Sequence, residues 1–244
     1  KLYCKSEKKN SDATVNRKYS CLSKIFTIAE QYKKCNQKPS FIWESEPDGK
    51  IRWLTWEEED QYLLYFEDNQ EIKDIIMLGC DTGMRAGEML SVPFTDYQNG
   101  KVNIWVNKND KPRSVPLTSR LLEMIGRRQM QDPYATTPFS YSYSWIRKLI
   151  KKASEDLQYP DVTIHTLRHT FASRLVQAGR PISNIQELMG HKTSAMTQRY
   201  AHLAPDHGAE DICVLEQRGV EMAKSGVKMV ENYANIQKVE YVTH

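Results

Sequence analysis

Apolar residues recur at helical spacing through most of the chain, beginning close to its start. In residues 12–33 they line one helical face, which predicts an amphipathic helix: Val15, Tyr19, Leu22, Phe26 and Ala29. Residues 36–52 show no sustained period and contain two prolines and a glycine. This segment is typical of a linker between domains.

The next apolar pattern is also helical. Thr55 followed by Glu58 has the spacing of a capping box, so a helix should begin there. The pattern continues, with a break near residue 69, to about Leu78, and Gly79 is suited to a helix end. We expect a turn at residues 81–83 and a short helix from there to Leu90.

The middle of the chain changes to a period of two. Asn99-Gly100 is a strong hairpin signal and precedes an alternating strand over residues 102–106. A polar loop at 107–111 should lead into a second strand at 113–117. Helical patterns follow at about 118–130, 142–157, 165–178, 183–190 and 194–202. The fold class is therefore mainly α with a small antiparallel β-sheet, that is, α+β.

Length and composition narrow the class of protein. The 244 residues, 40% of them hydrophobic, suit one large domain or one domain with a fragment of another. The longest apolar runs are too short to cross a bilayer, so we expect no membrane association. Five scattered cysteines without a C-x-x-C pair indicate a reduced, cytoplasmic compartment. Because the chain begins at Lys1 without the start of a domain, we expect an N-terminal portion to be missing.

Charge becomes informative when the chain is divided. The net charge is only +3, but residues 1–38 carry ten Lys and Arg against three acids. A basic arm of this kind attracts phosphate at long range. A solvated helix surface explains the same charges equally well.

Three clusters carry candidate chemistry. Arg85 lies three residues before Glu88, His165 three before Arg168, and a Gly-His pair ending at His191 nine before Tyr200. Cleavage of a phosphodiester without a metal needs a nucleophile, fixed positive donors and an acid. Arginine suits the donor task because its planar fork pairs with two oxygens. The His165–His169 pair lacks the glutamate of a zinc motif, and we expect no metal and no cofactor. His169 is interpreted as a structural histidine.

The order of these clusters resembles the tyrosine recombinase, or phage integrase, family. The stretch from Ile164 to Leu203 is similar to that family's C-terminal catalytic motif almost throughout, and the resemblance covers about residues 53–205. Residues 10–35 are similar, less distinctively, to the last helix of its core-binding domain. The resemblance implies the integrase catalytic fold and four segments: part of a core-binding domain (1–38), a linker (39–52), the catalytic domain (53–206) and a tail (207–244). We expect the tail to dock, either on a neighbouring subunit or on its own, and a poorly ordered terminus is the alternative.

The resemblance also implies a role for each matching residue. Tyr200 would be the nucleophile that forms a 3′-phosphotyrosine, Arg85 and Arg168 would bind the scissile phosphate, and Glu88 would orient the site. His165 would bind the phosphate or take the tyrosine proton, and His191 would donate to a phosphate oxygen. Lys108, in the hairpin loop, would protonate the leaving group, with Lys111 as the alternative.

The implied function is site-specific DNA recombination in a bacterial cell or phage. The partners would be double-stranded DNA, other copies of the chain in a tetramer, and accessory DNA-bending proteins. A type IB topoisomerase or a non-catalytic DNA-binding regulator are the alternatives. We expect further phosphate contacts from seven basic residues: Arg113, Arg127, Arg128, Arg147, Lys148, Lys151 and Lys152.

Overall fold

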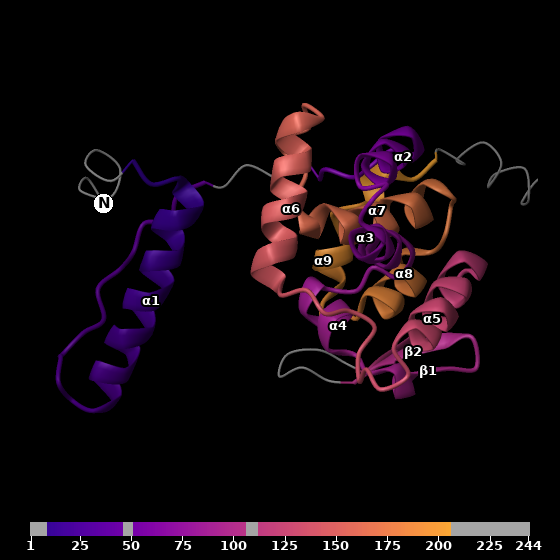
Figure 1. Ribbon diagram of the computed structural model, residues 1–244. Helices are drawn as coiled ribbons and strands as arrows, with labels where there is room; N and C mark the ends of the chain where they lie inside the picture. The colour runs from indigo at the N-terminus through magenta and orange to yellow at the C-terminus, as the bar shows by residue number, and fades with distance from the viewer. Residues whose placement is uncertain (1–8, 46–50, 106–111, 206–244) are drawn as a thin grey trace, which may run out of the picture. The chain divides into compact units, whose positions relative to one another are not determined.

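A computed structural model describes residues 9–45, 51–105 and 112–205 (Figure 1). The chain divides into two compact units between Lys50 and Ile51. The first unit is built on one long helix, α1 (Asp12–Gln31), which begins where the Ser11 hydroxyl accepts a hydrogen bond from the Thr14 amide. The expected amphipathic helix is therefore present.

The segment after α1 packs back along it. The Asn16 side chain exchanges two hydrogen bonds with the backbone of Glu44, each 2.9 Å long. The ring of Phe41 lies 5.4 Å from that of Tyr19, centroid to centroid. Part of the segment expected to be a linker is thus held against the helix, and the division of the chain into four functional segments stays a prediction.

The second unit contains the remaining described elements, and these confirm a mainly helical fold with a small antiparallel sheet. In chain order they are α2 (Trp56–Tyr65), α3 (Gln70–Thr82), α4 (Ala86–Ser91), β1 (Tyr97–Gln98), β2 (Lys101–Ile104), β3 (Arg113–Pro116), α5 (Ser119–Gln131), α6 (Tyr143–Asp156), α7 (Ile164–Gln177), α8 (Ile182–Met189) and α9 (Ser194–Gln198). None of the described helices is long and apolar enough to cross a membrane.

Two local signals in the sequence form the structures that they predict. Thr55 and Glu58 make the reciprocal bonds of a capping box at the start of α2. Asn99 and Gly100 both have positive φ, 52° and 71°, as a tight hairpin turn between β1 and β2 requires. The sheet has the order β1-β2-β3 and is antiparallel throughout.

The end of α3 differs from the expectation. The helix does not stop at Gly79 and there is no turn at 81–83; α3 continues to Thr82 and ends at Gly83, which has φ 62°. Gly79 lies inside the helix. The position needs a glycine because a Cβ there would come within 2.8 Å of the Leu167 Cβ on α7. Its lack of a side chain serves close packing between helices rather than helix termination.

This close contact sets the centre of the unit. Helices α3 and α7 pack against each other, and α8 packs on both α7 and β3 (Figure 1). The core along α3 and α7 is fully buried at Ile75, Ile76 and Ala172. As a result, the C-terminal ends of α3 and α8 lie beside the middle of α7, where polar side chains are concentrated.

Candidate active site

Arg168 joins the two helix ends to α7. Its side chain is only 3% exposed, and its guanidinium donates to the carbonyl oxygens of Gly83 and of Met189, the latter at 2.6 Å. Carbonyls at helix C-termini lack partners within the helix, so a buried donor satisfies them. The pKa of Arg168 is lowered to about 10 by burial and by the charges of Arg85 and Arg113.

Glu88, on α4, is held between two arginines. Its carboxylate, 4% exposed, accepts from the Arg85 amide at 2.8 Å, from the Arg85 guanidinium at 3.1 Å, and from both terminal nitrogens of Arg113. Burial by itself would raise the pKa of Glu88, but the bonds and charge of Arg113 hold it below the usual value. Arg85 is partly exposed, with 31% of its side chain accessible.

The position of Arg113 corrects one expectation. It was expected to contact DNA phosphate, yet its side chain is 4% exposed and is occupied by Glu88. Its aliphatic part also packs on Gly190, where a Cβ would lie 2.9 Å from the Arg113 Cδ. Arg113 is therefore a buried residue that holds Glu88 and the loop before His191 in place.

Tyr200 is buried against α7. It is 3% exposed, and its hydroxyl oxygen lies 2.6 Å from Nδ1 of His169. Burial raises the pKa of Tyr200, although the charges of Arg168 and Arg199 act in the opposite direction. Sequence reasoning gave His169 a purely structural role and missed this contact, although its spacing of four from His165 already put it on the same helical face.

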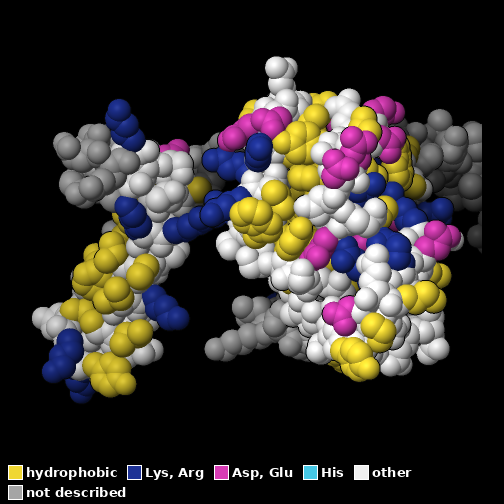
Figure 2. Space-filling view, in the orientation of Figure 1, with side chains coloured by type: hydrophobic (Ala, Val, Ile, Leu, Met, Phe, Trp, Pro, Cys, Tyr) yellow, Lys and Arg dark blue, Asp and Glu magenta, His cyan; other side chains and the backbone are white. Residues whose placement is uncertain are grey.

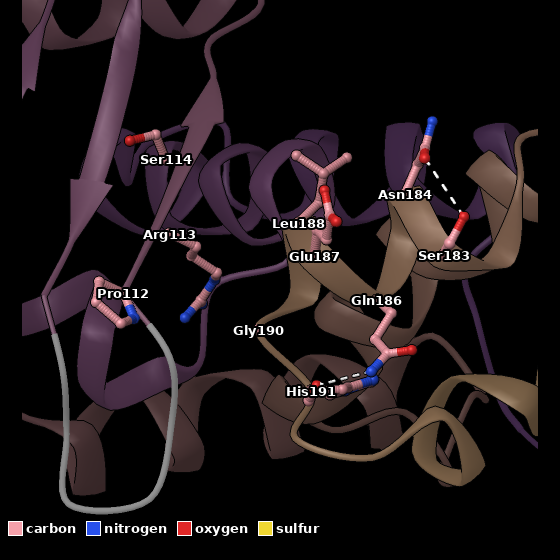
Figure 3. Close-up of a pocket in the computed structure, with 10 residues that line it drawn as sticks. All are labelled: Pro112, Arg113, Ser114, Ser183, Asn184, Gln186, Glu187, Leu188, Gly190 and His191. Carbon is pink, nitrogen blue, oxygen red and sulfur yellow. Dashed lines mark hydrogen bonds between the residues drawn. The ribbon is translucent and has the colours of Figure 1, made fainter.

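His191 follows Gly190, which ends α8 with φ 67°. Its Nδ1 lies 2.8 Å from the Thr197 hydroxyl, and its carbonyl accepts from the Gln186 side chain (Figure 3). His191 borders a cleft of about 680 Å³ between β3 and α8. Among the described residues expected to be catalytic, His191 is the one that lines this cleft.

The expected residues share one electrostatic environment. Burial, followed by the charges of Arg168 and Arg85, lowers the pKa of His165 and lowers that of His191 to about 4. These mutual effects show that Arg85, Arg168 and both histidines lie in one cationic site in which the imidazoles are neutral near pH 7.

Some expectations lie outside the described residues. Lys108 and Lys111 fall in the gap between positions 105 and 112, and the tail falls beyond position 205. Across the described ranges, no group of three or more His, Cys, Asp or Glu side chains is placed to hold a metal ion.

The basic residues expected to contact DNA separate into two groups. Arg127 and Arg128, on α5, both bind the fully buried Asp74, with 2.7 Å contacts, so ion pairing within the fold accounts for their place in the sequence. The four on α6 are exposed, and Figure 2 shows Lys and Arg side chains gathered over this helix. Two of them, Arg147 and Lys151, line a hollow that reaches His165.

Comparison with known sequences gives the family of the unit that holds these residues. The model of the phage integrase family matches residues 52–207. The integrase of Haemophilus phage HP1 is 28% identical over 209 residues, which are 80% of this chain and 58% of that protein. The integrase of Escherichia phage 186 is 31% identical over 160 residues, 65% of this chain and 46% of that protein. The chain thus spans about half the length of these curated relatives.

Solved structures have the same fold. The catalytic domain of bacteriophage HP1 integrase is 25% identical, with a TM-score of 0.56 over 67% of this chain and 94% of that one. The Tn1549 transposon integrase in complex with transposon right end DNA is 21% identical, with a TM-score of 0.71 over 87% of this chain and 82% of that one. Because the family model matches well over half of its residues, the chain belongs to the phage integrase family.

Proposed function

We propose that this chain carries the catalytic activity of a site-specific DNA recombinase, which cleaves and rejoins strands through a covalent 3′-phosphotyrosine at Tyr200. The observation that carries the proposal is the buried cationic site around Arg168. Burial and the charges of Arg85 and Arg113 lower the pKa of Arg168 there, and the buried carboxylate of Glu88 acts in the opposite direction. Several positive charges beside a phenol are suited to an oxyanion substrate.

Each side chain has a task in that reaction. The Tyr200 oxygen attacks phosphorus, the bond from phosphorus to the 5′ oxygen breaks, and the 5′ oxygen takes a proton. Arg168 carries five N–H donors, so its two carbonyl bonds leave others for a phosphate oxygen. Arg85, oriented by Glu88, would bind from the partly exposed side. Loss of one such donor typically costs about 3–4 kcal/mol of transition-state stabilisation.

The remaining assignments are also proposals. His191, held by Thr197, would donate to a non-bridging oxygen, and His165 would face the phosphate. Lys108, or else Lys111, would protonate the leaving oxygen. The exposed basic side chains of α6 would bind the DNA backbone beside His165.

The assembly follows from the same proposal. We propose that the chain acts on double-stranded DNA as a tetramer in a phage or mobile element, with its tail docked on a neighbouring copy and with accessory DNA-bending proteins where the target requires them. Support for DNA binding comes from the exposed basic helix and from the fold shared with an integrase bound to DNA.

The test is covalent capture in EDTA. The chain is incubated with a library of duplexes nicked next to each candidate site, and adducts are isolated under denaturing conditions and sequenced. We expect an adduct with the wild type and none with Tyr200→Phe, which should still bind DNA. An adduct formed by Tyr200→Phe, or none formed by the wild type, would contradict the proposal. Strand exchange between two captured sites then distinguishes a recombinase from a relaxing enzyme.

A further inference from the structure

The hydroxyl of Tyr200 has one hydrogen-bond partner among the described residues, and that partner is His169. The distance from the hydroxyl oxygen to Nδ1 is 2.6 Å, within the range of a strong O–H to nitrogen bond. The two residues come from different elements: His169 from α7, and Tyr200 from the turn after α9. The fold therefore brings an imidazole nitrogen directly to the atom that would attack phosphorus.

The protonation states define what this contact can do. Burial and then the charges of His165, Arg199 and Arg168 lower the pKa of His169 to about 4. The ring is consequently neutral near pH 7, and one of its nitrogens is a bare acceptor. The phenol is also neutral, because burial raises its pKa. In the tautomer that carries its hydrogen on Nε2, the neutral phenol donates to a bare Nδ1, and from this arrangement a proton can be transferred.

Resting on the proposed recombinase function, we propose that His169 is the catalytic base for Tyr200: it orients the phenol and accepts its proton as the oxygen attacks phosphorus. In this step the O–H bond of Tyr200 breaks, the proton moves to Nδ1, the bond from Tyr200 to phosphorus forms, and the bond to the 5′ oxygen breaks. In religation the His169 imidazolium returns the proton to the departing Tyr200.

The surrounding charges favour transfer only when the substrate is present. In the site without substrate, Arg168 and Arg199 disfavour an imidazolium at His169, and His165 and His191 lie in the same environment. A phosphate bound between these groups would offset the arginine charges, which raises the basicity of His169. The base would thus become effective when the scissile phosphate is in place.

His165 is less suited to this task. Its ring meets that of His169 edge to face, with 4.6 Å between centroids, but it has no hydrogen bond to Tyr200 among the contacts of the described residues. It is exposed and borders the hollow lined by Arg147 and Lys151. This position favours contact with phosphate and leaves the tyrosine proton to His169.

The test compares His169→Asn with His165→Asn in single-turnover cleavage of a captured site at saturating DNA. The asparagine oxygen at position 169 can still accept a hydrogen bond but cannot carry the proton. We expect adduct formation by His169→Asn to slow by about 10²- to 10⁴-fold, the range of general acid–base catalysis, with the dissociation constant for DNA within threefold of the wild type. A rate within threefold of the wild type would overturn the proposal.

A second substrate identifies which oxygen His169 serves. Replacement of the bridging 5′ oxygen by sulfur gives a leaving group that needs no proton, so a defect in the leaving-group acid is rescued and a defect in the base is not. We expect His169→Asn to stay slow on the sulfur substrate, and rescue there would overturn the proposal. If His169→Asn and His169→Gln both fail to fold, by circular dichroism and DNA binding, His169 has a packing role and the proposal is also wrong. In each of these cases, an adduct formed at Tyr200 by the wild type would still support the proposed function.

Discussion

Replacement of Arg113 by methionine tests whether a buried ion pair supports the site. The change removes both bonds from Arg113 to Glu88 and leaves a carboxylate that is 4% exposed with Arg85 as its remaining cationic partner. Breaking a buried pair by removing one partner costs about 3–5 kcal/mol. Because the two bonds from Arg85 persist, we expect the lower end, about 3 kcal/mol in the free energy of unfolding.

The assay is thermal unfolding followed by circular dichroism. For a unit of this size, 1 kcal/mol shifts the Tm by about 2–4 °C, so Arg113→Met should melt about 6–12 °C below the wild type. Arg127→Met is the matched control: the Arg127 side chain is 36% exposed, Asp74 keeps its bonds to Arg128 and Gln70, and the loss should stay at about 1 kcal/mol.

A double variant separates the pair from the space that it fills. Glu88→Met combined with Arg113→Met leaves no buried charge unpaired and should recover most of the lost stability, since apolar replacements of buried pairs are often neutral. We expect the double variant to lose cleavage, because the Glu88 carboxylate no longer orients Arg85. A Tm for Arg113→Met within 2 °C of the wild type would show that Arg113 does not stabilise the buried carboxylate of Glu88.

Three further predictions concern the histidines, a glycine and the α6 surface. The pKa of His169 and of His191 is about 4 in the folded chain against about 6.5 when unfolded, so the unfolded state binds more protons between these values. The free energy of unfolding should therefore fall on acidification from pH 6.5 to 4, by about 1 kcal/mol per pH unit for each ring after allowance for solvent exposure. In urea titrations, His191→Asn should remove the part of this pH dependence that His191 contributes. Gly83→Ala, at φ 62° and with an aromatic carbon 2.5 Å from the new Cβ, should cost at least about 2 kcal/mol and abolish adduct formation, whereas Gly87→Ala, in open space, should melt like the wild type. Arg147→Ala should weaken DNA binding uniformly across sequences and reduce the slope of log affinity against log salt by about 1. An unchanged slope would show that Arg147, on α6, does not contact the DNA backbone.

Local chemistry explains why much of the fold could be predicted. Thr55 with Glu58, and Asn99 with Gly100, satisfy or bend the backbone within a few residues, so their signals survive in any context. Gly79 and Gly83 look alike in sequence, and only the approach of Leu167 decides which one is needed for packing and which ends the helix. Tertiary contact of this kind is not encoded near the residue that it governs.

The same distinction applies to the site. The motif spacing put Arg85 beside Glu88 and His165 on the same helical turn as Arg168, and the family order supplied the other candidates, whose roles stay predictions. The pairing of Arg113 with Glu88 spans 25 residues and depends on the register that places Arg113 opposite Ile104. One signal was available. Arg113 and Val115 are two residues apart, so they lie on the same face of β3, and Val115 is buried. An arginine on the buried face of a strand requires an acidic partner, and Glu88 already belonged to the cluster that begins at Arg85.

The like charges that the site brings together lower the stability of the fold that holds them. Among the described residues, the buried carboxylate of Glu88 pairs with Arg85 and Arg113, and burial together with the charges of these two arginines lowers the pKa of Arg168. Helix-end carbonyls, rather than further acids, fix Arg168, so its position is set without cancelling its charge. An acid in place of those carbonyls would stabilise the free protein and reduce its attraction for phosphate. Fixing a cation with neutral dipoles keeps the charge available to the transition state, which is the arrangement that electrostatic catalysis requires.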